Sequence, residues 1–365
     1  MNRSILAGAA IAGMLILASN AWSAPALPTA AVIRDQPLTL GLPKAGRTRP
    51  LVVVLADNAG TETTDFVIPY GVLKESGAAD VLTVSTGSGT VQLMMALKIR
   101  ADETTAQFDA AEPAGADIVV VPAMMNNADP KLIAWVKAQY VKGATLLSIC
   151  EGARILAGAG LLEGKSATTH WAALDDLASA YPGTHWVRDR RYVQDGRIIS
   201  TTGVSASIPA TLALVEAIAG HATAAATARR LGVKDWSSSH SSAAFTLMGS
   251  DLTQGVWNFL AFWRHETVEA PVADGVDEIR LALETDAWTR TLRSHVVSTS
   301  GNTVEVRSLR GLRIEPDALP SGDGYVLPEY PGGPVAALDG ALNDIDRRIG
   351  PSTTRLVTLG LEYPR

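Results

Sequence analysis

The chain has 365 residues and a formal net charge of −6, from 31 lysines and arginines against 37 aspartates and glutamates. This mildly acidic balance disfavours a nucleic-acid partner, and the length is sufficient for two domains of ordinary size. The six histidines are scattered without metal-ligand spacing, so we expect no metal and no cofactor.

The first residues are typical of a secretory signal peptide. Met-Asn-Arg precedes an apolar run from Ile5 to Ala18, and small residues surround a cleavage point after Ser23. The run is shorter than a membrane span requires, and no basic stop-transfer cluster follows it. We therefore expect cleavage of residues 1–23, a periplasmic or secreted protein, and no membrane contact afterwards. Residues 24–48, rich in proline and alanine, are expected to form a linker.

Residues 49–220 show strands alternating with helices. Strands are predicted at 51–56, 81–85, 117–121 and 143–149, helices at 65–75, 129–140 and 208–219, and a hairpin at 191–202. Such alternation indicates an α/β domain with a mainly parallel sheet covered by helices on both faces.

The only cysteine lies where one predicted strand turns into a helix. Leu146, Leu147 and Ile149 suit a buried strand before Cys150, and Gly152 permits a tight corner. This pattern is that of a nucleophile elbow with cysteine in place of serine. A helix N-terminus lowers the pKa of a thiol, so we expect Cys150 to form a thiolate near neutral pH. A buried, unreactive cysteine is the alternative.

An internal repeat extends to the end of the chain. Residues 84–91 (VSTGSGTV) nearly match residues 297–304 (VSTSGNTV), and residues 116–122 resemble residues 322–328 in the same order. A self-similar unit indicates a duplicated module. We therefore predict that residues 266–365 form a truncated second copy of the first domain's N-terminal half.

The second copy ends before a second elbow, so it has no nucleophile. It is expected to contain a helix at 335–349 and a strand at 354–361, and to cover an apolar sheet face of the first copy. Residues 221–265 connect the copies. Their apolar stretch 255–263 is interpreted as ordinary packing between the copies, with a lid or an interaction surface as the alternative.

Two segments resemble one known family. Ser148–Ala153 (SICEGA) and Leu156–Trp171 are similar to the DJ-1/PfpI family within the class I glutamine-amidotransferase-like fold. The similarity is greatest to the branch of isocyanide hydratases and of the amidase-like sensor domains of AraC-type regulators, whose strand–turn–strand signature residues 192–206 also resemble. The resemblance implies a flavodoxin-like parallel sheet sandwiched by helices. It also implies that the second copy packs on the first as two subunits pack in a family dimer, giving a monomer or weak dimer.

The resemblance also assigns a carboxylic acid beside the cysteine. Family members carry it four residues before a proline, and Asp65 stands in that position before Pro69. A protonated carboxyl can donate a hydrogen bond to a thiolate and favour it. We therefore expect Asp65 within hydrogen-bond reach of the Cys150 sulfur. A role as helix N-cap is the alternative.

Other positions match the family only in part. The backbone N–H groups of Glu151 and Gly152 are candidate oxyanion donors, together with Ala123, which stands where the family has glycine. A glutamate beside the thiol would raise the thiol pKa unless Glu151 turns away to a cation such as Arg154. His170 is a candidate catalytic residue, or else anchors its strand beside a tryptophan.

These residues favour a cysteine-dependent hydratase or hydrolase, or a glyoxalase-like enzyme, that acts on a small electrophilic substrate. Candidate substrates are an isocyanide, an α-ketoaldehyde or an amide. The alternatives are a non-catalytic periplasmic ligand-binding or sensing module, and a redox-responsive protective protein whose cysteine is oxidised. In each case the partner is a small molecule.

Overall fold

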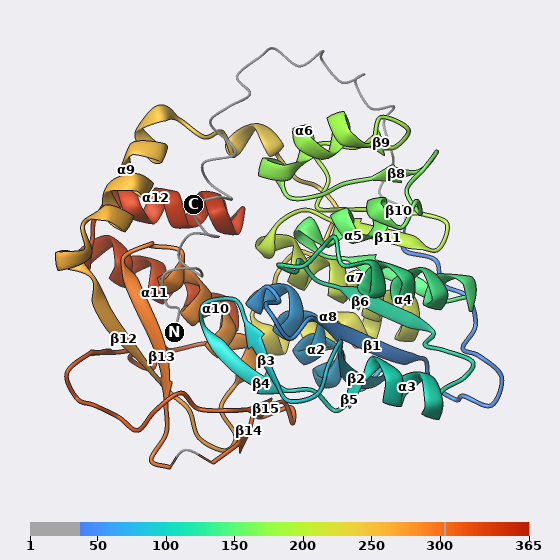
Figure 1. Ribbon diagram of the computed structural model, residues 1–365, viewed down its shortest axis with the longest axis horizontal. Helices are drawn as coiled ribbons and strands as arrows, with labels where there is room; N and C mark the ends of the chain where they lie inside the picture. The colour runs from blue at the N-terminus through green and yellow to red at the C-terminus, as the bar shows by residue number, and fades with distance from the viewer. Residues whose placement is uncertain (1–36, 303, 365) are drawn as a thin grey trace.

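The computed structural model describes residues 37–302 and 304–364 (Figure 1). The predicted signal peptide and the start of the predicted linker lie outside these residues. Within the described ranges, no helix combines the length and the hydropathy that a membrane crossing requires. The described end of the linker is attached to the first domain, because Arg47 forms ion pairs with Glu112 and Asp117.

A seven-stranded sheet forms the centre of the first domain. Its strands, in spatial order, are β10 (Tyr192–Asp195), β11 (Ile198–Thr201), β7 (Thr145–Ser148), β6 (Ile118–Val121), β1 (Leu51–Ala56), β2 (Asp80–Ser85) and β5 (Glu103–Thr104). All neighbours are parallel except β10 and β11, which form the predicted hairpin. The expected α/β fold with a mainly parallel sheet is confirmed.

The central strands are apolar on both sides because helices cover both faces. In β1, Val52 and Val54 point into one core, whereas Val53 and Leu55 point into the other. The first core lies under α2 (Thr63–Ser76), α7 (Ser207–Ala219) and α8 (His221–Leu231). The second lies under α3 (Thr105–Ala111), α4 (Pro130–Val141), α5 (Ala153–Gly158) and α6 (Trp171–Ala180).

The C-terminal region contains a smaller parallel sheet. Its strand order is β13 (Ser294–Thr299), β12 (Glu266–Pro271) and β16 (Tyr325–Val326), and its helices are α10 (Glu278–Thr289), α11 (Pro334–Arg348) and α12 (Pro351–Leu361). The order β13-β12-β16, with α10 between β12 and β13, is the order of β2-β1-β6, with α2 between β1 and β2.

One local hydrogen-bond pattern also occurs in both regions. The Asp102 carboxylate accepts from the Thr83 amide and hydroxyl at 2.9 and 2.8 Å, and the Asp102 amide donates to the Thr83 hydroxyl at 2.9 Å. Asp317 and Ser298 make the same three bonds, at 3.0, 2.7 and 3.1 Å. The two regions thus share a sheet order and this hydrogen-bond pattern, while the repeat itself stays a prediction.

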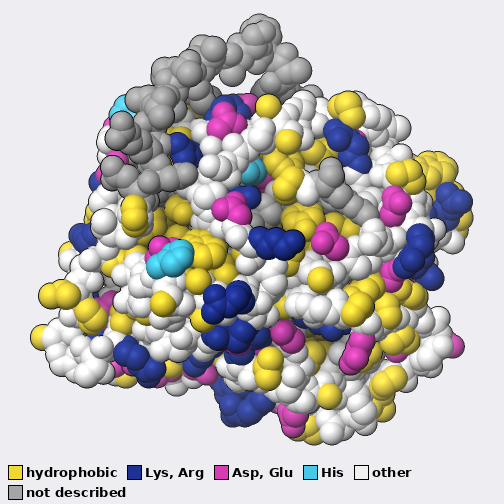
Figure 2. Space-filling model, turned by 180° about the vertical axis from the view of Figure 1, so that it is seen from behind, with side chains coloured by type: hydrophobic (Ala, Val, Ile, Leu, Met, Phe, Trp, Pro, Cys, Tyr) yellow, Lys and Arg dark blue, Asp and Glu magenta, His cyan; other side chains and the backbone are white. Residues whose placement is uncertain are grey.

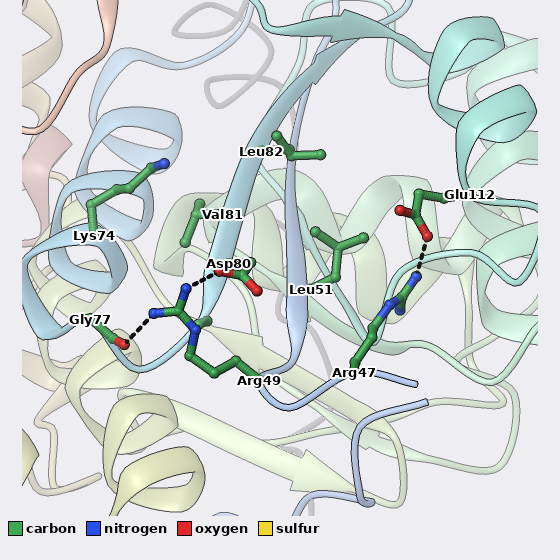
Figure 3. Close-up of a pocket in the computed structure, with 10 residues that line it drawn as sticks. Arg47, Arg49, Leu51, Lys74, Gly77, Asp80, Val81, Leu82 and Glu112 are labelled. Carbon is green, nitrogen blue, oxygen red and sulfur yellow. Dashed lines mark hydrogen bonds and ion pairs between the residues drawn. The ribbon is translucent and has the colours of Figure 1, made fainter. Parts of the chain in front are cut away.

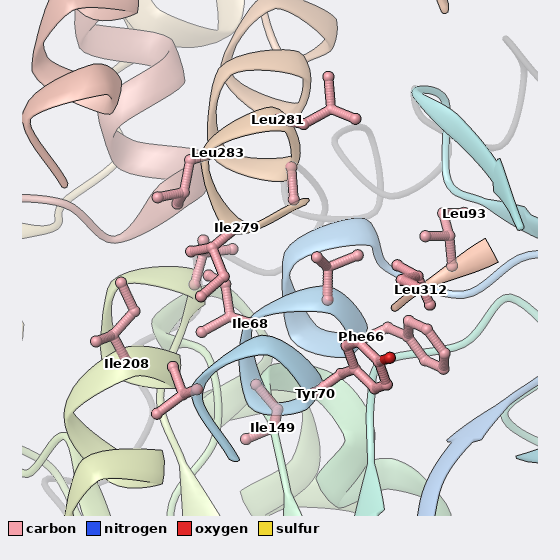
Figure 4. Close-up of a cluster of buried hydrophobic side chains, with 14 of the residues drawn as sticks. Phe66, Ile68, Tyr70, Leu93, Ile149, Ile208, Ile279, Leu281, Leu283 and Leu312 are labelled. Carbon is pink, nitrogen blue, oxygen red and sulfur yellow. The ribbon is translucent and has the colours of Figure 1, made fainter. Parts of the chain in front are cut away.

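The two regions meet through helices and a shared small sheet. Helices α2 and α10 pack against each other, and Ile68 of α2 lies toward Ile279 of α10 (Figure 4). Four antiparallel strands form one sheet across the boundary, in the order β14 (Val306–Arg307), β15 (Arg313–Ile314), β4 (Leu97–Arg100) and β3 (Thr90–Leu93). The second region thus contacts the first through a helix and a hairpin. The sequence analysis predicted that it would instead cover a sheet face of the first copy.

The predicted strand at 354–361 is wrong, because these residues form part of α12. The β-branched Thr353, Thr354 and Val357 favour a strand by local propensity. However, Pro351 occupies the first helical position, where its missing N–H has no consequence, and the helix packs against α11 and α9 (Gly249–Leu260). The connecting region 221–265 likewise contains two helices, α8 and α9, that the sequence pattern did not indicate.

The close approach of α2 and α10 depends on Gly71. A Cβ atom at this position would lie 2.5 Å from Cγ1 of Ile279. We expect Gly71→Val to lower the free energy of unfolding by about 1–3 kcal/mol, because overpacking forces the two helices apart. Urea unfolding measures this change. Gly41→Val is the matched control, because nothing lies within 4 Å of a Cβ there. Equal midpoints for the two variants would show that this contact is not tight.

Candidate active site around Cys150

Cys150 lies at a strained corner directly after the central strand β7. Its φ is 54°, a left-handed value that non-glycine residues seldom adopt, and residues Cys150–Gly152 form a short 3₁₀ helix, η2, that leads into α5. A Cβ atom at residue 152 would lie 2.0 Å from the Val121 carbonyl oxygen, so only glycine fits there. The amide of Cys150 donates to the Thr202 carbonyl at 3.1 Å, which ties the corner to the end of β11.

Asp65 is fully buried in the first turn of α2, on the side of the sheet where Cys150 lies. Its Oδ2 accepts from the Ala123 amide at 3.1 Å, while its Oδ1 has no partner among the described residues. The structure records no hydrogen bond from Asp65 to the Cys150 sulfur, so that bond stays a prediction. The alternative cap role falls to Glu62, whose carboxylate accepts from the Asp65 amide at 2.6 Å.

A cation from the C-terminal region completes this carboxyl cluster. Arg290 follows α10 and lies 2.8 Å from Oε1 of Glu62 and 2.8 Å from Oδ2 of Asp286. Its Nη1 also donates to the Gly360 carbonyl at 3.2 Å. The second region has no elbow of its own in the described residues. It nevertheless supplies Arg290, the cation that pairs with Glu62 of the first region.

The electrostatics of the site oppose the expected thiolate. Burial raises the pKa of the Cys150 thiol well above its usual range, and the charges of Asp65, Glu151 and Glu62 raise it further. Arg290 is the cation that lowers it. The prediction of a lowered thiol pKa is therefore wrong, because burial and the neighbouring carboxyl groups outweigh the helix N-terminus.

Burial also raises the pKa of the Asp65 carboxyl well above the usual range. The neighbouring Glu62 raises it further, against the hydrogen bond from Ala123. A buried carboxyl with one unpartnered oxygen can donate or accept a proton there. The site therefore contains two buried groups, Cys150 and Asp65, whose pKa values are both raised.

Glu151 turns away from the sulfur. Its Oε2 lies 2.6 Å from Nε of Arg154, and Arg154 also lies 3.6 Å from Asp176. This pairing is the condition under which a glutamate beside the thiol is compatible with activity. The charge of Glu151 still raises the pKa of the thiol, but burial and Asp65 each raise it more.

Two of the three predicted oxyanion donors are occupied in this structure. The Gly152 amide donates to the Ile149 carbonyl at 2.8 Å, and the Ala123 amide donates to Asp65. The Glu151 amide remains the candidate donor for negative charge that develops at a substrate bound to Cys150.

His170 is the N-cap of α6, and its neighbour Thr169 donates to the Cys150 carbonyl at 2.9 Å. Its Nδ1 accepts from the Ala172 amide at 3.3 Å, so neutral His170 carries its proton on Nε2. Nε2 is buried and without a partner in the described part of the chain. The arrangement favours a hydrogen-bond donor over a general base. The ring also lies against Trp171, at 5.6 Å between centroids, as in the anchoring alternative.

The end of the chain lies against the same loops. Oε2 of Glu362 accepts from the Gly203 amide at 2.6 Å, and its Oε1 lies 2.8 Å from Nε2 of His240. A Cβ at residue 203 would lie 2.7 Å from Cδ2 of His170, so Glu362 and His170 enclose one glycine. Sequence reasoning missed Glu362, His240, Glu62 and Arg290.

Cys150 itself is buried, with 8% of its surface exposed. A pocket of about 590 Å³ lies at the opposite ends of β1 and β2, between Arg47, Arg49 and Lys74 (Figure 3). On the rear face of the molecule, charged side chains of both signs alternate with hydrophobic ones (Figure 2).

Residues 51–217 match the family model described as the DJ-1/PfpI family. A deglycase from Pyrococcus horikoshii is 30% identical over 144 residues, which are 38% of this chain and 82% of the deglycase. The chain belongs to the DJ-1/PfpI family.

Other relatives in the DJ-1/PfpI family match over different lengths. An isonitrile hydratase from Pseudomonas putida is 36% identical over 26% of this chain and 41% of the hydratase. Protein DJ-1 homolog B from Arabidopsis thaliana is 26% identical over 291 residues, 75% of this chain and 61% of the homologue. A DJ-1 superfamily protein of known structure from Salmonella typhimurium covers 51% of this chain and 100% of its own, at 26% identity and a TM-score of 0.45.

The role of Arg290 in the thiol equilibrium is testable with Arg290→Met. Because Arg290 lowers the pKa of Cys150, its removal should raise the apparent thiol pKa above that of the wild-type protein. The ultraviolet absorbance of the thiolate against pH measures this, after subtraction of matched proteins that carry Cys150→Ser. Arg290→Lys keeps the charge and should shift the titration less. Coincident titrations of Arg290→Met and the wild type would contradict the assignment of Arg290 as the cation that lowers the thiol pKa.

The carboxyl cluster should also make stability depend on pH. Burial raises the pKa of Asp286 to about 7, although Arg290 opposes this. An unfolded aspartate ionises near about 3.9, so folding favours the protonated acid, and its contribution is lost as pH rises from about 4 to about 7. Urea unfolding at several pH values should therefore show a smaller loss of stability for Asp286→Asn. Asp286→Glu should keep the loss of stability with rising pH. Parallel curves of stability against pH for the wild type and both variants would refute this prediction.

Proposed function

We propose that this protein is a cysteine-dependent enzyme that adds its thiol to an unsaturated carbon of a small electrophile. The observation that carries the proposal is the pair formed by Cys150 at its strained corner and the buried Asp65, whose pKa is raised by burial. The isonitrile hydratase and deglycase relatives support a small substrate with an electrophilic carbon.

The raised pKa values of Cys150 and Asp65 favour addition over displacement. A neutral thiol adds sulfur and hydrogen together, so an isocyanide or the carbonyl of an α-ketoaldehyde can accept both without a charged leaving group. An amide, in contrast, requires expulsion of an amine. An isocyanide or α-ketoaldehyde is therefore the better substrate class for this site.

An isocyanide would react in two steps. The Cys150 sulfur bonds to the terminal carbon, the thiol proton passes to Asp65, and the Asp65 proton goes to that same carbon, giving a thioimidate. Water then attacks the carbon, the carbon–sulfur bond breaks, and one water proton goes to the substrate nitrogen while the other restores the thiol. The net change is the addition of one water, which gives a formamide.

Other residues have supporting roles in this proposal. The Glu151 amide and the Nε2–H of His170 are the donors available to negative charge on the substrate. Arg290 limits the charge of the carboxyl cluster, so that Cys150 can pass through a thiolate during the first step.

We also infer that residues 266–361 are a duplicated half-domain that stands in for a second subunit. The common strand order, the repeated Asp102 and Asp317 hydrogen bonds, and the long match to DJ-1 homolog B support this. That match spans 75% of the chain and so extends beyond residues 51–217. A monomer or weak dimer is the expected state. The sequence of residues 1–23 supports an address outside the cytoplasm.

The burial of Cys150 favours a second candidate, a sensing module that binds a small molecule without turnover. Cys150 is 8% exposed and its thiol pKa is raised, which are properties of a cysteine that reacts slowly. Turnover and binding are therefore measured together.

The test is to incubate the purified protein with an aryl isocyanide and, separately, with methylglyoxal, and to follow product by chromatography. We expect turnover of one of them, its abolition by Cys150→Ser, and a loss of about 10²-fold or more in kcat for Asp65→Asn. Asp65→Glu keeps an acid and should recover part of the rate.

Binding of either compound without product, at equal affinity in wild type and Cys150→Ser, would instead identify the sensing module. Turnover that persists in Cys150→Ser would overturn the assignment of the nucleophile.

A further inference from the structure

Helix α9 presents its apolar side to solvent and buries its polar side. Asp251, Gly255 and Asn258 are buried, whereas Trp257 is 50% exposed and Leu260 is 58% exposed. An amphipathic helix normally packs the other way round. The predicted packing of residues 255–263 between the two copies is therefore wrong.

The buried polar side is fixed by hydrogen bonds to other elements. Asp251 pairs with Arg355 at 3.0 Å, and the Asn258 amide donates to Thr291 and Thr353, both at 2.9 Å. Because these groups are buried, turning the helix would leave them unsatisfied. The outward position of the apolar side is thus a stable property of the fold.

The apolar side continues into the short 3₁₀ helix η5 (Phe262–Arg264). Phe262 is 74% exposed and Trp263 is 65% exposed. The rings pack on one another at the surface, with 5.2 Å between the centroids of Phe262 and Trp263, and 6.1 Å between those of Trp257 and Trp263. We call Trp257, Leu260, Phe262 and Trp263 the aromatic patch. A contiguous patch of this kind marks a contact surface.

Basic groups adjoin the aromatic patch. The exposed Arg264 follows Trp263, and Nε of Arg293 donates to the Arg264 carbonyl at 3.0 Å. Neither arginine forms an ion pair within the described ranges, while the nearby acid Glu266 is paired with Arg348. Hydrophobic and basic side chains lie together at the right-hand edge in Figure 2, the edge that α9 forms on the left in Figure 1.

We propose that the aromatic patch docks on a membrane surface that contains anionic lipid headgroups. Tryptophan and phenylalanine side chains suit the headgroup boundary, and adjacent arginines are attracted by anionic headgroups. The net charge of −6 would repel such a surface, so the cations around the patch would determine which side approaches it. The sequence alone led us to expect no membrane partner.

A second copy of the chain is a less suitable occupant. In a two-fold dimer the same patch would face itself, which would bring Arg264 and Arg293 of both copies together. A lipid surface provides the opposite charge instead. The proposal does not depend on the chemistry at Cys150.

The test uses the chain from Ala24 onward, the form that the predicted cleavage would give, because the apolar run before it would itself bind lipid. Co-sedimentation with vesicles of phosphatidylglycerol and phosphatidylethanolamine measures binding, and tryptophan fluorescence reports burial of the patch. We expect binding that weakens with salt and a blue shift of the emission.

Matched variants separate the two parts of the proposal. Phe262→Ser with Trp263→Ser should reduce binding about tenfold or more. Arg264→Gln with Arg293→Gln should reduce it by a similar factor, and only with vesicles that contain phosphatidylglycerol. Leu42→Ser is the control, because Leu42 is 94% exposed and lies two residues before Lys44, whose amide donates to Asp117 of the first domain.

Three outcomes would overturn the proposal. These are no binding by the unsubstituted chain, equal binding by the Phe262 and Trp263 variant, and a dimer in light scattering that this variant abolishes. The last would assign the patch to a second copy.

Discussion

The ion pair between Glu62 and Arg290 links the two halves of the chain at the edge of the candidate site. Glu62 caps α2 by accepting from the Asp65 amide, so it sets the position of Asp65, while its other oxygen binds Arg290 from the C-terminal half. Loss of Arg290 would leave Glu62 and Asp286 as buried carboxylates without a counter-ion, which is costly. The geometry beside Cys150 therefore requires residues from both halves, and the packing of α2 on α10 is what brings them together.

The same cluster determines the protonation of the site. One cation faces the carboxyl groups of Glu62 and Asp286, with Asp65 beside them, and burial raises the pKa values of Asp65 and Asp286. Burial also raises the pKa of the Cys150 thiol. Raised pKa values on both the thiol and the acid suit reactions in which hydrogen is added with sulfur. They suit less well those reactions that need a permanent thiolate.

Local sequence patterns predicted the first domain well and the second half only in part. Strands such as β1 and the corner at Cys150 depend on residues that are adjacent in sequence, so alternation, apolar runs and Gly152 were sufficient. Arg290 is 228 positions from Glu62 and left no local signal. The sign of the Cys150 pKa shift was wrong for the same reason. The helix N-terminus is visible in the sequence, whereas burial by α2 and the approach of Asp65 are properties of the folded chain.

Two errors in the C-terminal half have one physical cause. Residues 354–361 have the β-branched content of a strand, but as helix α12 they direct Arg355, with Thr353 two residues before it, toward α9. Those two side chains satisfy Asp251 and Asn258, which allows α9 to bury its polar side. Without α12, the buried Asp251 and Asn258 would lose Arg355 and Thr353 as partners. The outward position of the aromatic patch thus depends on a helix at the place of the predicted strand.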